Sequence, residues 1–135
     1  VTKGKIGDNA KLVVKEKLMT SGKQIAKTMF EIELDGEGSS ANIMSRSVAN
    51  GSPVQEFLSK INGNNKCAGH SECEAIIMDD SSVKAIPEIT ANHIDASLIH
   101  EAAIGKIAGE QITKLMTLGL DQEEAEREII NGFLM

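Results

Sequence analysis

The residues best suited to chemistry are a few thiols, imidazoles and carboxylates at short spacings. Cys67, His70 and Cys73 form a C-x2-H-x2-C run, which has the residue types of half a zinc or iron site. Three residues of extended chain span about 10 Å, so chelation by the whole run requires a turn, for which Gly69 is the only local help. A metal site that includes Cys67 and His70, and buried cysteines with a purely structural role, are both compatible with this pattern.

A second candidate is the His100-Glu101 pair. In the segment 94–104, His100 shares its alternate positions with residues such as Leu98 and Ile104, so alternation predicts that it faces the core while Glu101 faces the opposite side. A hydrogen-bonded core histidine and a metal-ligating histidine both fit. Imidazole and carboxylate are competent iron ligands, but two neighbours on opposite faces of a strand do not readily share one ion.

Composition excludes several classes of function. The net charge is -6, and there is no Tyr, no Trp and only three Phe, whereas nucleic-acid binding needs basic stripes and usually aromatic platforms. No apolar run approaches the roughly 20 residues of a membrane span, and the first residues do not have the pattern expected of a secretory leader. We expect a cytoplasmic chain with free thiols and no membrane or nucleic-acid partner. Because it begins at Val1 with a strand-like pattern, we expect a fragment of a longer protein.

Up to about Ile107 the hydrophobic pattern has period two, which predicts an all-β region. No helical pattern separates the candidate strands, so a doubly wound α/β sheet is disfavoured and a sandwich, a barrel or a β-solenoid remains. Asn50-Gly51 and Asn62-Gly63, taken alone, favour antiparallel hairpins. Small polar corners about every 12 to 15 residues suit a solenoid instead. The candidate strands lie at about 26–35, 41–48, 53–61, 72–78, 82–89 and 94–104.

After Ile107 the period becomes helical. One helix is predicted from about Glu110 to Leu118, before Gly119. A second begins at a capping box formed by Asp121 and Glu124 and is predicted to end at Gly132. Two helices this short cannot bury an apolar face alone, so they must pack on the β-region or on another protein.

Several motifs in register give a resemblance to a known family. The stretch Gly69-His70-Ser71-Glu72-Cys73, then Ile86-Pro87-Glu88, then 99–107 (IHEAAIGKI), is similar to the C-terminal signature of the SufB/SufD family of iron–sulfur cluster assembly proteins. The tail agrees, with 110–120 (EQITKLMTLGL) followed by Asn131-Gly132-Phe133-Leu134. The resemblance is good over about 65–134 and less distinctive before that.

The resemblance implies a right-handed parallel β-helix over 1–107, followed by a short helical tail over 108–135. It also implies a non-catalytic scaffold that works with a SufC-type ATPase and pairs, through the β-helix, with a SufB/SufD paralogue or a second copy. A transient iron–sulfur cluster is the implied cofactor. The tail is the implied ATPase-docking element. Its predicted docking residues are Ile112, Leu115, Met116, Ile129, Ile130 and Phe133.

The resemblance also assigns candidate site residues. His100 matches a histidine implicated in cluster formation, Glu101 matches the glutamate of SufB types, and Cys73 matches a position often occupied by cysteine in SufB types. The chain departs from the family at Ser81, where SufB types place the cysteine thought to hold the nascent cluster. A hydroxyl cannot replace a thiolate in iron binding or persulfide transfer. Either Cys73 and His100 carry the ligation, or the chain is a SufD-like or ancestral single paralogue whose assembly site differs.

Two other functions compete with this hypothesis. A glycosidase needs two carboxylates about 5 to 9.5 Å apart, but Asp79 and Asp80 are adjacent, and no aromatic sugar platform is present. The other alternative is a purely structural β-solenoid interaction module without a metal role.

Overall fold

A computed structural model describes residues 1–135 as eight strands followed by two helices. The strands form two parallel four-stranded sheets, which we call sheet A (β1-β3-β5-β7) and sheet B (β2-β4-β6-β8). The strands are β1 (Thr2–Ile6), β2 (Lys11–Gly22), β3 (Ile25–Leu34), β4 (Ser39–Gly51), β5 (Val54–Gly63), β6 (Cys67–Ile77), β7 (Ser82–Ala91) and β8 (Ala96–Gly105).

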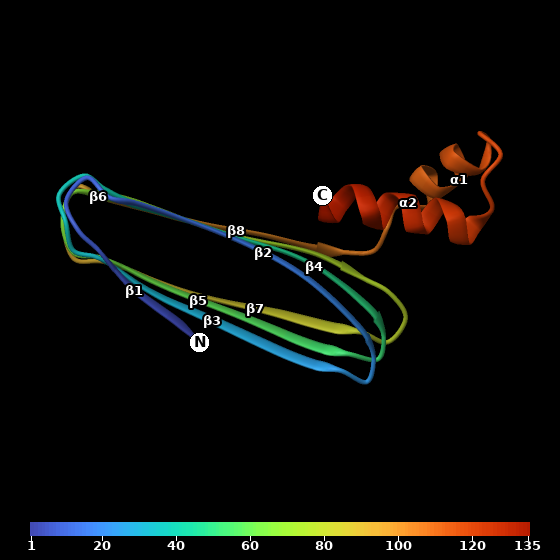
Figure 1. Ribbon diagram of the computed structural model, residues 1–135, viewed down its shortest axis with the longest axis horizontal. Coiled ribbons are helices and arrows are strands. Elements are labelled where there is room, and N and C mark those ends of the chain that lie inside the picture. Colours follow the sequence, from blue (N-terminus) through green and yellow to red (C-terminus); the bar gives the residue numbers. More distant parts are fainter.

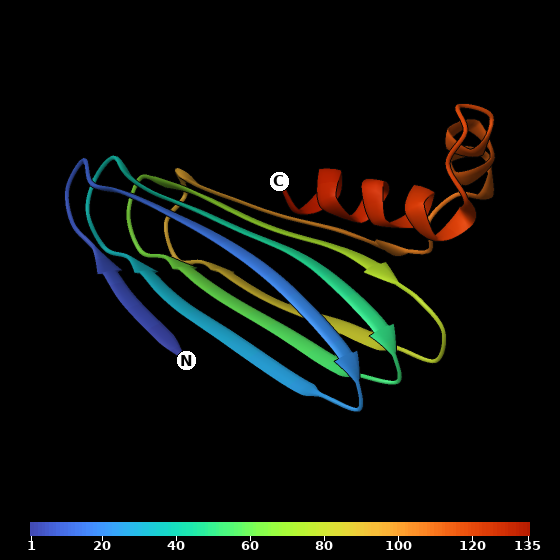
Figure 2. The same cartoon turned by 45° about the vertical axis from the view of Figure 1, so that its right-hand side comes forward.

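The chain winds as a flattened parallel β-helix. Each coil contributes one strand to sheet A and the next strand to sheet B, and the corners of successive coils stack at both ends (Figures 1 and 2). The registers are uninterrupted, so each residue of a coil lies beside its equivalent in the next coil, for example Ser45 beside Cys73. This confirms the parallel β-helix with a helical tail. The antiparallel pairing that Asn50-Gly51 and Asn62-Gly63 favour when taken alone is wrong, because β4 and β5 lead at these points into corners between the sheets.

The positive φ of Gly51 (98°) shows why a hairpin-like dipeptide serves a solenoid corner. A hairpin turn and the solenoid corner at Gly51 both need a residue in the left-handed region, which glycine adopts without a Cβ clash. In a hairpin the following strand pairs with the preceding one, whereas here it joins the opposite sheet. Local chemistry therefore identified the turn but not the partner strand.

The core lies between the two sheets. Alternate residues of each strand point inward, and the largest buried group is apolar and includes Phe30, Ile32, Leu34, Ile43 and Phe57. The Phe30 and Phe57 rings lie 6.0 Å apart between centroids in a tilted arrangement. No helical residue belongs to this cluster. The hydrophobic contacts that hold the coils together are therefore made within the solenoid itself.

The observed strands differ from the predicted ones mainly in two places, before residue 25 and at the start of β6. Strands β1 and β2 precede the first predicted strand, and β6 begins at Cys67 rather than at 72. Cys67 and Gly69 face inward on β6, where a Cβ on Gly69 would lie 2.8 Å from the Leu98 side chain. The small polar residues at this point predicted a loop. They lie in a strand instead, because closely packed coils leave room only for small side chains.

The tail consists of α1 (Gly109–Met116) and α2 (Gln122–Leu134). The capping box is confirmed: Asp121 accepts a hydrogen bond from the Glu124 amide at 2.8 Å, and Glu124 accepts one from the Asp121 amide at 2.9 Å. The prediction that Gly132 ends α2 is wrong, since the helix continues to Leu134. Phe133, in the added turn, lies beside Arg46 of sheet B, so tertiary packing extends the helix past the glycine.

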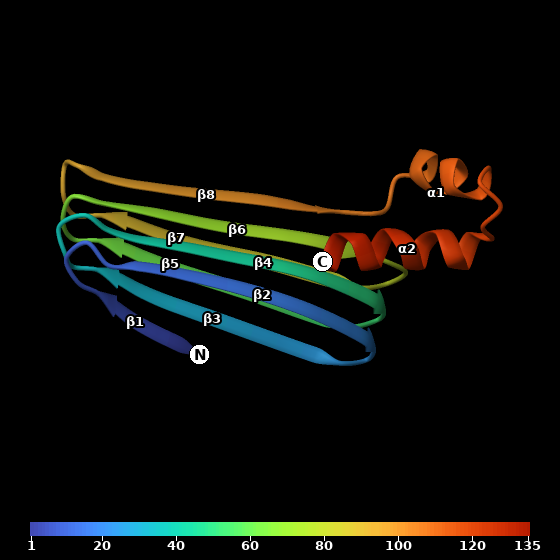
Figure 3. The same cartoon turned by 45° about the horizontal axis from the view of Figure 1, so that its top comes forward.

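The two helices have different surroundings. Helix α2 packs against β4 on the outer face of sheet B and buries Ala125 and Ile130, whereas α1 buries no residue (Figure 3). Leu118, just after α1, is 77% exposed. Neither helix has the length and apolar composition that crossing a membrane requires. The tail therefore leaves an apolar surface centred on α1.

Gly36 should be indispensable to coil stacking. A Cβ at Gly36 would lie 2.1 Å from the Asp8 amide nitrogen and from the Gly7 carbonyl carbon, both backbone atoms of the preceding coil. We expect Gly36→Ala to lower the free energy of unfolding by about 3 kcal/mol, because a backbone clash cannot be relieved by a rotamer change. Urea denaturation measures the loss. Gly7→Ala is the matched control at the same corner, since its Cβ would meet nothing within 4 Å; equal losses in the two variants would contradict the explanation.

Candidate functional site

The space between the sheets contains a polar row as well as the apolar core. Glu16, Ser45, Cys73 and Ala102 lie side by side in register on β2, β4, β6 and β8. The Glu16 carboxylate accepts a hydrogen bond from the Ser45 hydroxyl at 2.7 Å and one from Thr28 of sheet A at 3.3 Å. Cys73 is 1% exposed. A buried thiol and an interior carboxylate are thus separated by one serine.

The adjacent inward row ends at His100. Ile43, Ser71 and His100 are in register on β4, β6 and β8. The Ser71 hydroxyl is hydrogen-bonded across the interior to that of Ser59 at 2.7 Å. The Nδ1 atom of His100 is buried and has no hydrogen-bond partner. Unpaired buried polar atoms are uncommon in folded proteins, which marks His100 as an imidazole with an unused lone pair or proton.

His100 and Cys73 are neighbours on one face. Cys73 pairs with Ala102, which is two residues beyond His100 on the same strand, so the two side chains point into the same interior from adjacent strands. Burial is the main factor that lowers the pKa of His100, and the nearby His70 lowers it further. The neutral imidazole, which is the metal-binding form, is therefore favoured at neutral pH.

The environment of Cys73 also disfavours the charged form, but for a thiol the charged form is the one that binds metal. Burial raises the pKa of the Cys73 thiol from its ordinary value of 9.0 to about 11, and the negative charges of Glu16 and Glu74 act in the same direction. The thiolate is the form that binds metals and attacks electrophiles. Cys73 is consequently a protonated thiol in this structure, and binding of a metal would have to displace its proton.

The other candidates lie away from this pair. His70 and Glu101 project from the outer face of sheet B, with 3.4 Å between His70 Nε2 and Glu101 Oε2. Cys67 faces inward six residues before Cys73 and is 6% exposed. The C-x2-H-x2-C run therefore follows an extended strand whose histidine faces away from both cysteines. No group of three or more His, Cys, Asp or Glu side chains is placed to hold one metal ion.

Ser81 lies at the corner between β6 and β7. Its hydroxyl accepts a hydrogen bond from the Met78 amide at 3.1 Å, and its own amide donates to the Met78 carbonyl at 3.2 Å. The same corner lies near Gly105, because Ile76 pairs with Gly105. His100 is five residues earlier on β8, roughly 16 Å along an extended strand. Asp79 and Asp80 share this corner, and Asp79 has a positive φ of 53°.

Sequence reasoning missed the polar residues that surround Cys73 and His100 inside the solenoid. Ser45 lies beside the Cys73 thiol and is hydrogen-bonded to Glu16, and Ser71 lies beside His100 and is hydrogen-bonded to Ser59. A signal for Glu16 was present, because it interrupts the alternate apolar positions Leu12, Val14 and Leu18 of one strand. Its neighbours could not be identified, because they depend on the register between coils.

The raised pKa predicts the reactivity of Cys73. At pH 8, a thiol of pKa about 11 has roughly 100-fold less thiolate than one of pKa 9.0. We expect iodoacetamide to modify Cys73 at least 100-fold more slowly in the folded protein than in urea, with a rate that still rises above pH 9. Site-resolved mass spectrometry measures both rates, and a Cys67→Ala background removes the other thiol. A rate that levels off below pH 9 would be inconsistent with this environment.

Comparison with known proteins connects these observations. The family described as "SUF system FeS cluster assembly, SufBD core domain" matches residues 4–133. An iron-sulfur cluster assembly SufBD family protein of Methanothermobacter thermautotrophicus is 34% identical over 130 residues, which are 95% of this chain and 32% of that protein. A protein of the same description from Archaeoglobus fulgidus is 40% identical over 102 residues, 75% of this chain and 28% of the relative.

A third relative carries a more specific name. The iron-sulfur cluster assembly protein SufB of Bacillus subtilis is 31% identical over 99 residues, 70% of this chain and 21% of that protein. The chain thus spans about a third or less of the length of these relatives. Because the family match extends over nearly all of its coils and into α2, the chain belongs to the SufBD family of iron–sulfur cluster assembly proteins.

Proposed function

We propose that this chain is part of a non-catalytic scaffold subunit on which iron–sulfur clusters are built in the cytoplasm, in complex with a SufC-type ATPase. The observation that carries the proposal is the family match over residues 4–133. Since the chain spans about a third of its relatives, the activity refers to the whole gene product. The nascent cluster is the cargo of this subunit.

The interior pair supports a role for His100 and Cys73 in holding that cargo. His100 offers a neutral imidazole with an unpartnered Nδ1 atom, and Cys73 offers a sulfur on the adjacent strand. Soft thiolate and imidazole ligands suit iron in clusters. Glu101 lies outside the solenoid with His70, so in our proposal it acts at the outer surface of the last strand, β8.

The tail and the open edges support the two proposed partners. The half-buried Ile112 and Leu115 of α1, with the exposed Met116 and Leu118, provide an apolar surface for the ATPase. Ile130 is already buried within the chain and Phe133 lies against Arg46, so among the predicted docking residues these two have contacts of their own. Strands β7 and β8 each end a sheet, and their unpaired edges are where a paralogue or a second copy would pair.

Anaerobic reconstitution tests the proposed function. The full-length gene product, mixed with its SufC-type ATPase, is supplied with ferrous iron and sulfide, and visible charge-transfer absorption reports a bound cluster. We expect a cluster that stays with the protein through gel filtration. Absence of any cluster, with the complex intact, would support a purely structural β-solenoid module instead.

A further inference from the structure

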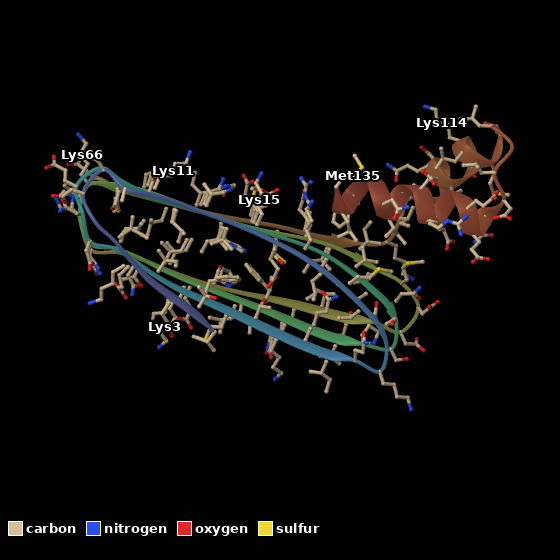
Figure 4. The ribbon with its side chains drawn as sticks, viewed as in Figure 1. Lys3, Lys11, Lys15, Lys66, Lys114 and Met135 are labelled. Carbon is tan, nitrogen blue, oxygen red and sulfur yellow. The ribbon has the colours of Figure 1, made fainter.

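The chain contains three Asn-Gly sequences in three different structural settings. Asn50 precedes the glycine that ends β4, Asn62 precedes the one that ends β5, and Asn131 lies within α2. The corners after β4 and β5 are at opposite ends of the coils, and Lys66, in the corner that follows β5, marks one of these ends in Figure 4. Glycine leaves the amide nitrogen after an asparagine unhindered and its backbone free to turn, so this nitrogen can attack the asparagine side chain. The fold therefore presents one reactive motif in three environments.

Asn62 is restrained by its neighbours in the solenoid. Its side-chain nitrogen donates a hydrogen bond to the Glu33 carboxylate at 2.7 Å. The next residue, Gly63, is closely packed, since a Cβ there would lie 3.0 Å from the Ala96 side chain and 3.1 Å from the Cys67 sulfur. Attack on the Asn62 side chain therefore requires the carboxamide to leave Glu33 and a packed part of the coil to move.

Asn131 is restrained by the helix that contains it. Helix α2 continues to Leu134, and the Asn131 carbonyl accepts a hydrogen bond from the Met135 amide at 3.0 Å. In an α-helix each amide points to the carbonyl four residues earlier, so the Gly132 amide points along the helix and away from the Asn131 side chain. The last turns of α2 would have to unwind before this amide could react.

Asn50 has neither restraint. Its side chain is half-buried, and its carboxamide makes no hydrogen bond with the protein. Gly51 has a φ of 98°, outside the conformations of strand and helix. Continuation of the register would place the Met78 carbonyl opposite the Gly51 amide, but that carbonyl accepts a hydrogen bond from the Ser81 amide at 3.2 Å. Among the three sequences, Asn50-Gly51 thus has the least restrained side chain and the least restrained following amide.

We propose that Asn50 is a site of spontaneous deamidation in the folded protein. The Gly51 amide nitrogen attacks the side-chain carbonyl carbon of Asn50, a new C–N bond closes a five-membered imide, and the side-chain nitrogen leaves as ammonia with the proton of the amide. Water then opens the imide at one of its two carbonyls, which gives aspartate or isoaspartate. Water is the only co-reactant. The inference is independent of the proposed function.

Deamidation would change this corner of the solenoid in two ways. It adds a negative charge next to the coil that contains Asp80, whose amide donates to the Gly51 carbonyl at 2.9 Å. Isoaspartate also adds a carbon to the main chain, although the Ser52 amide is bonded to the Gly22 carbonyl of the preceding coil at 2.8 Å. A longer main chain cannot keep its bonds to both neighbouring coils, so the modified corner should be less stable. Ser81 lies in the corner stacked on this one.

Peptide mass spectrometry tests the assignment. The full-length gene product is incubated at mildly alkaline pH and digested at intervals. We expect Asn50 to be converted at least about tenfold faster than Asn62 and Asn131, because those two react only after local opening. In urea the three should react at similar rates. Equal rates in the folded protein, or no conversion of Asn50 over a period in which the unfolded chain reacts, would overturn the proposal.

Two variants separate the restraints from the motif. Glu33→Ala removes the partner of the Asn62 carboxamide and should accelerate conversion of Asn62 while leaving that of Asn50 unchanged. Asn50→Gln keeps a carboxamide but requires a larger ring, so its urea midpoint should stay constant during the incubation that lowers the midpoint of the wild type. An equal fall in the two proteins would show that the change arises at another residue and would refute a destabilising modification at Asn50.

Discussion

Deletion of residues 109–135 is expected to abolish co-purification with the SufC-type ATPase and to leave a folded β-solenoid. The buried apolar cluster between the sheets contains no residue from α1 or α2. The solenoid strands end at Gly105, before α1 begins. Circular dichroism and the urea midpoint measure whether the solenoid persists, and affinity capture of the ATPase measures docking. Undiminished capture would show that the ATPase binds elsewhere.

The deletion should reduce stability only modestly. Helix α2 buries Ala125 and Ile130, and burial of an aliphatic side chain contributes about 1.5 to 3 kcal/mol relative to exposure. Arg46, which lies under Phe133, keeps its 2.7 Å ion pair with Glu74 when the tail is removed. A large fall in the urea midpoint would mean that loss of ATPase binding reflects unfolding, and a point variant is then decisive.

Leu118→Asp is that point variant. Leu118 is 77% exposed, so the aspartate is solvated in the free protein and should not affect folding. If α1 enters an apolar site on the ATPase, the buried charge should weaken binding by tenfold or more, as expected for a central contact residue. Gln111→Asp adds the same charge to exposed surface of α1 and is the control. Equal effects of the two variants would indicate general electrostatics rather than docking through the apolar surface.

His100→Ala and Cys73→Ala are each expected to reduce the yield of reconstituted cluster several-fold without unfolding the protein. The two side chains share the interior near the last coil, and the buried Nδ1 atom of His100 has no partner to lose. Loss of a ligand removes the bond to iron, whereas the surrounding strands keep their registers. Absorption in the visible range and iron and sulfide analysis measure the yield.

The chain supplies a matched control for each substitution. Cys67→Ala removes a second buried, inward-facing thiol from the same strand, and His70→Ala removes a histidine from the outer face. Neither should change the cluster yield if ligation is specific to the interior pair. If all four variants give the wild-type yield, His100 and Cys73 are structural residues and the cluster is held elsewhere.

Ser81→Cys distinguishes the interior pair from the corner where the resemblance to SufB types predicts a cysteine. We expect no gain in cluster yield, because Ser81 is engaged with Met78 at a corner roughly 16 Å along the strand from His100. Wild type that holds no cluster, together with a Ser81→Cys variant that does, would place assembly at the corner. The substitution also exchanges a hydroxyl acceptor for a weaker sulfur acceptor, so the folded state should be confirmed first.

Local patterns predicted much of the fold because they depend on neighbours in the chain. Alternation around His100 predicted that it faces inward, and the Asp121 and Glu124 spacing predicted a capping box that forms as expected. Where the outcome depended on distant packing, the same reasoning failed. Gly132 lies within α2 because Phe133 packs near Arg46, and the Asn-Gly corners join different sheets.

The sequence by itself determined which residues could do chemistry and where the period changes from strand to helix, because both are properties of residue type and short spacing. Only the tertiary structure decided which of those residues meet. Cys73 and His100 are 27 positions apart, yet they share an interior because successive coils repeat in register, while Ser81, closer to Cys73 in the chain, lies at a corner. The register between coils is set by packing across the whole solenoid, and no local pattern contains it.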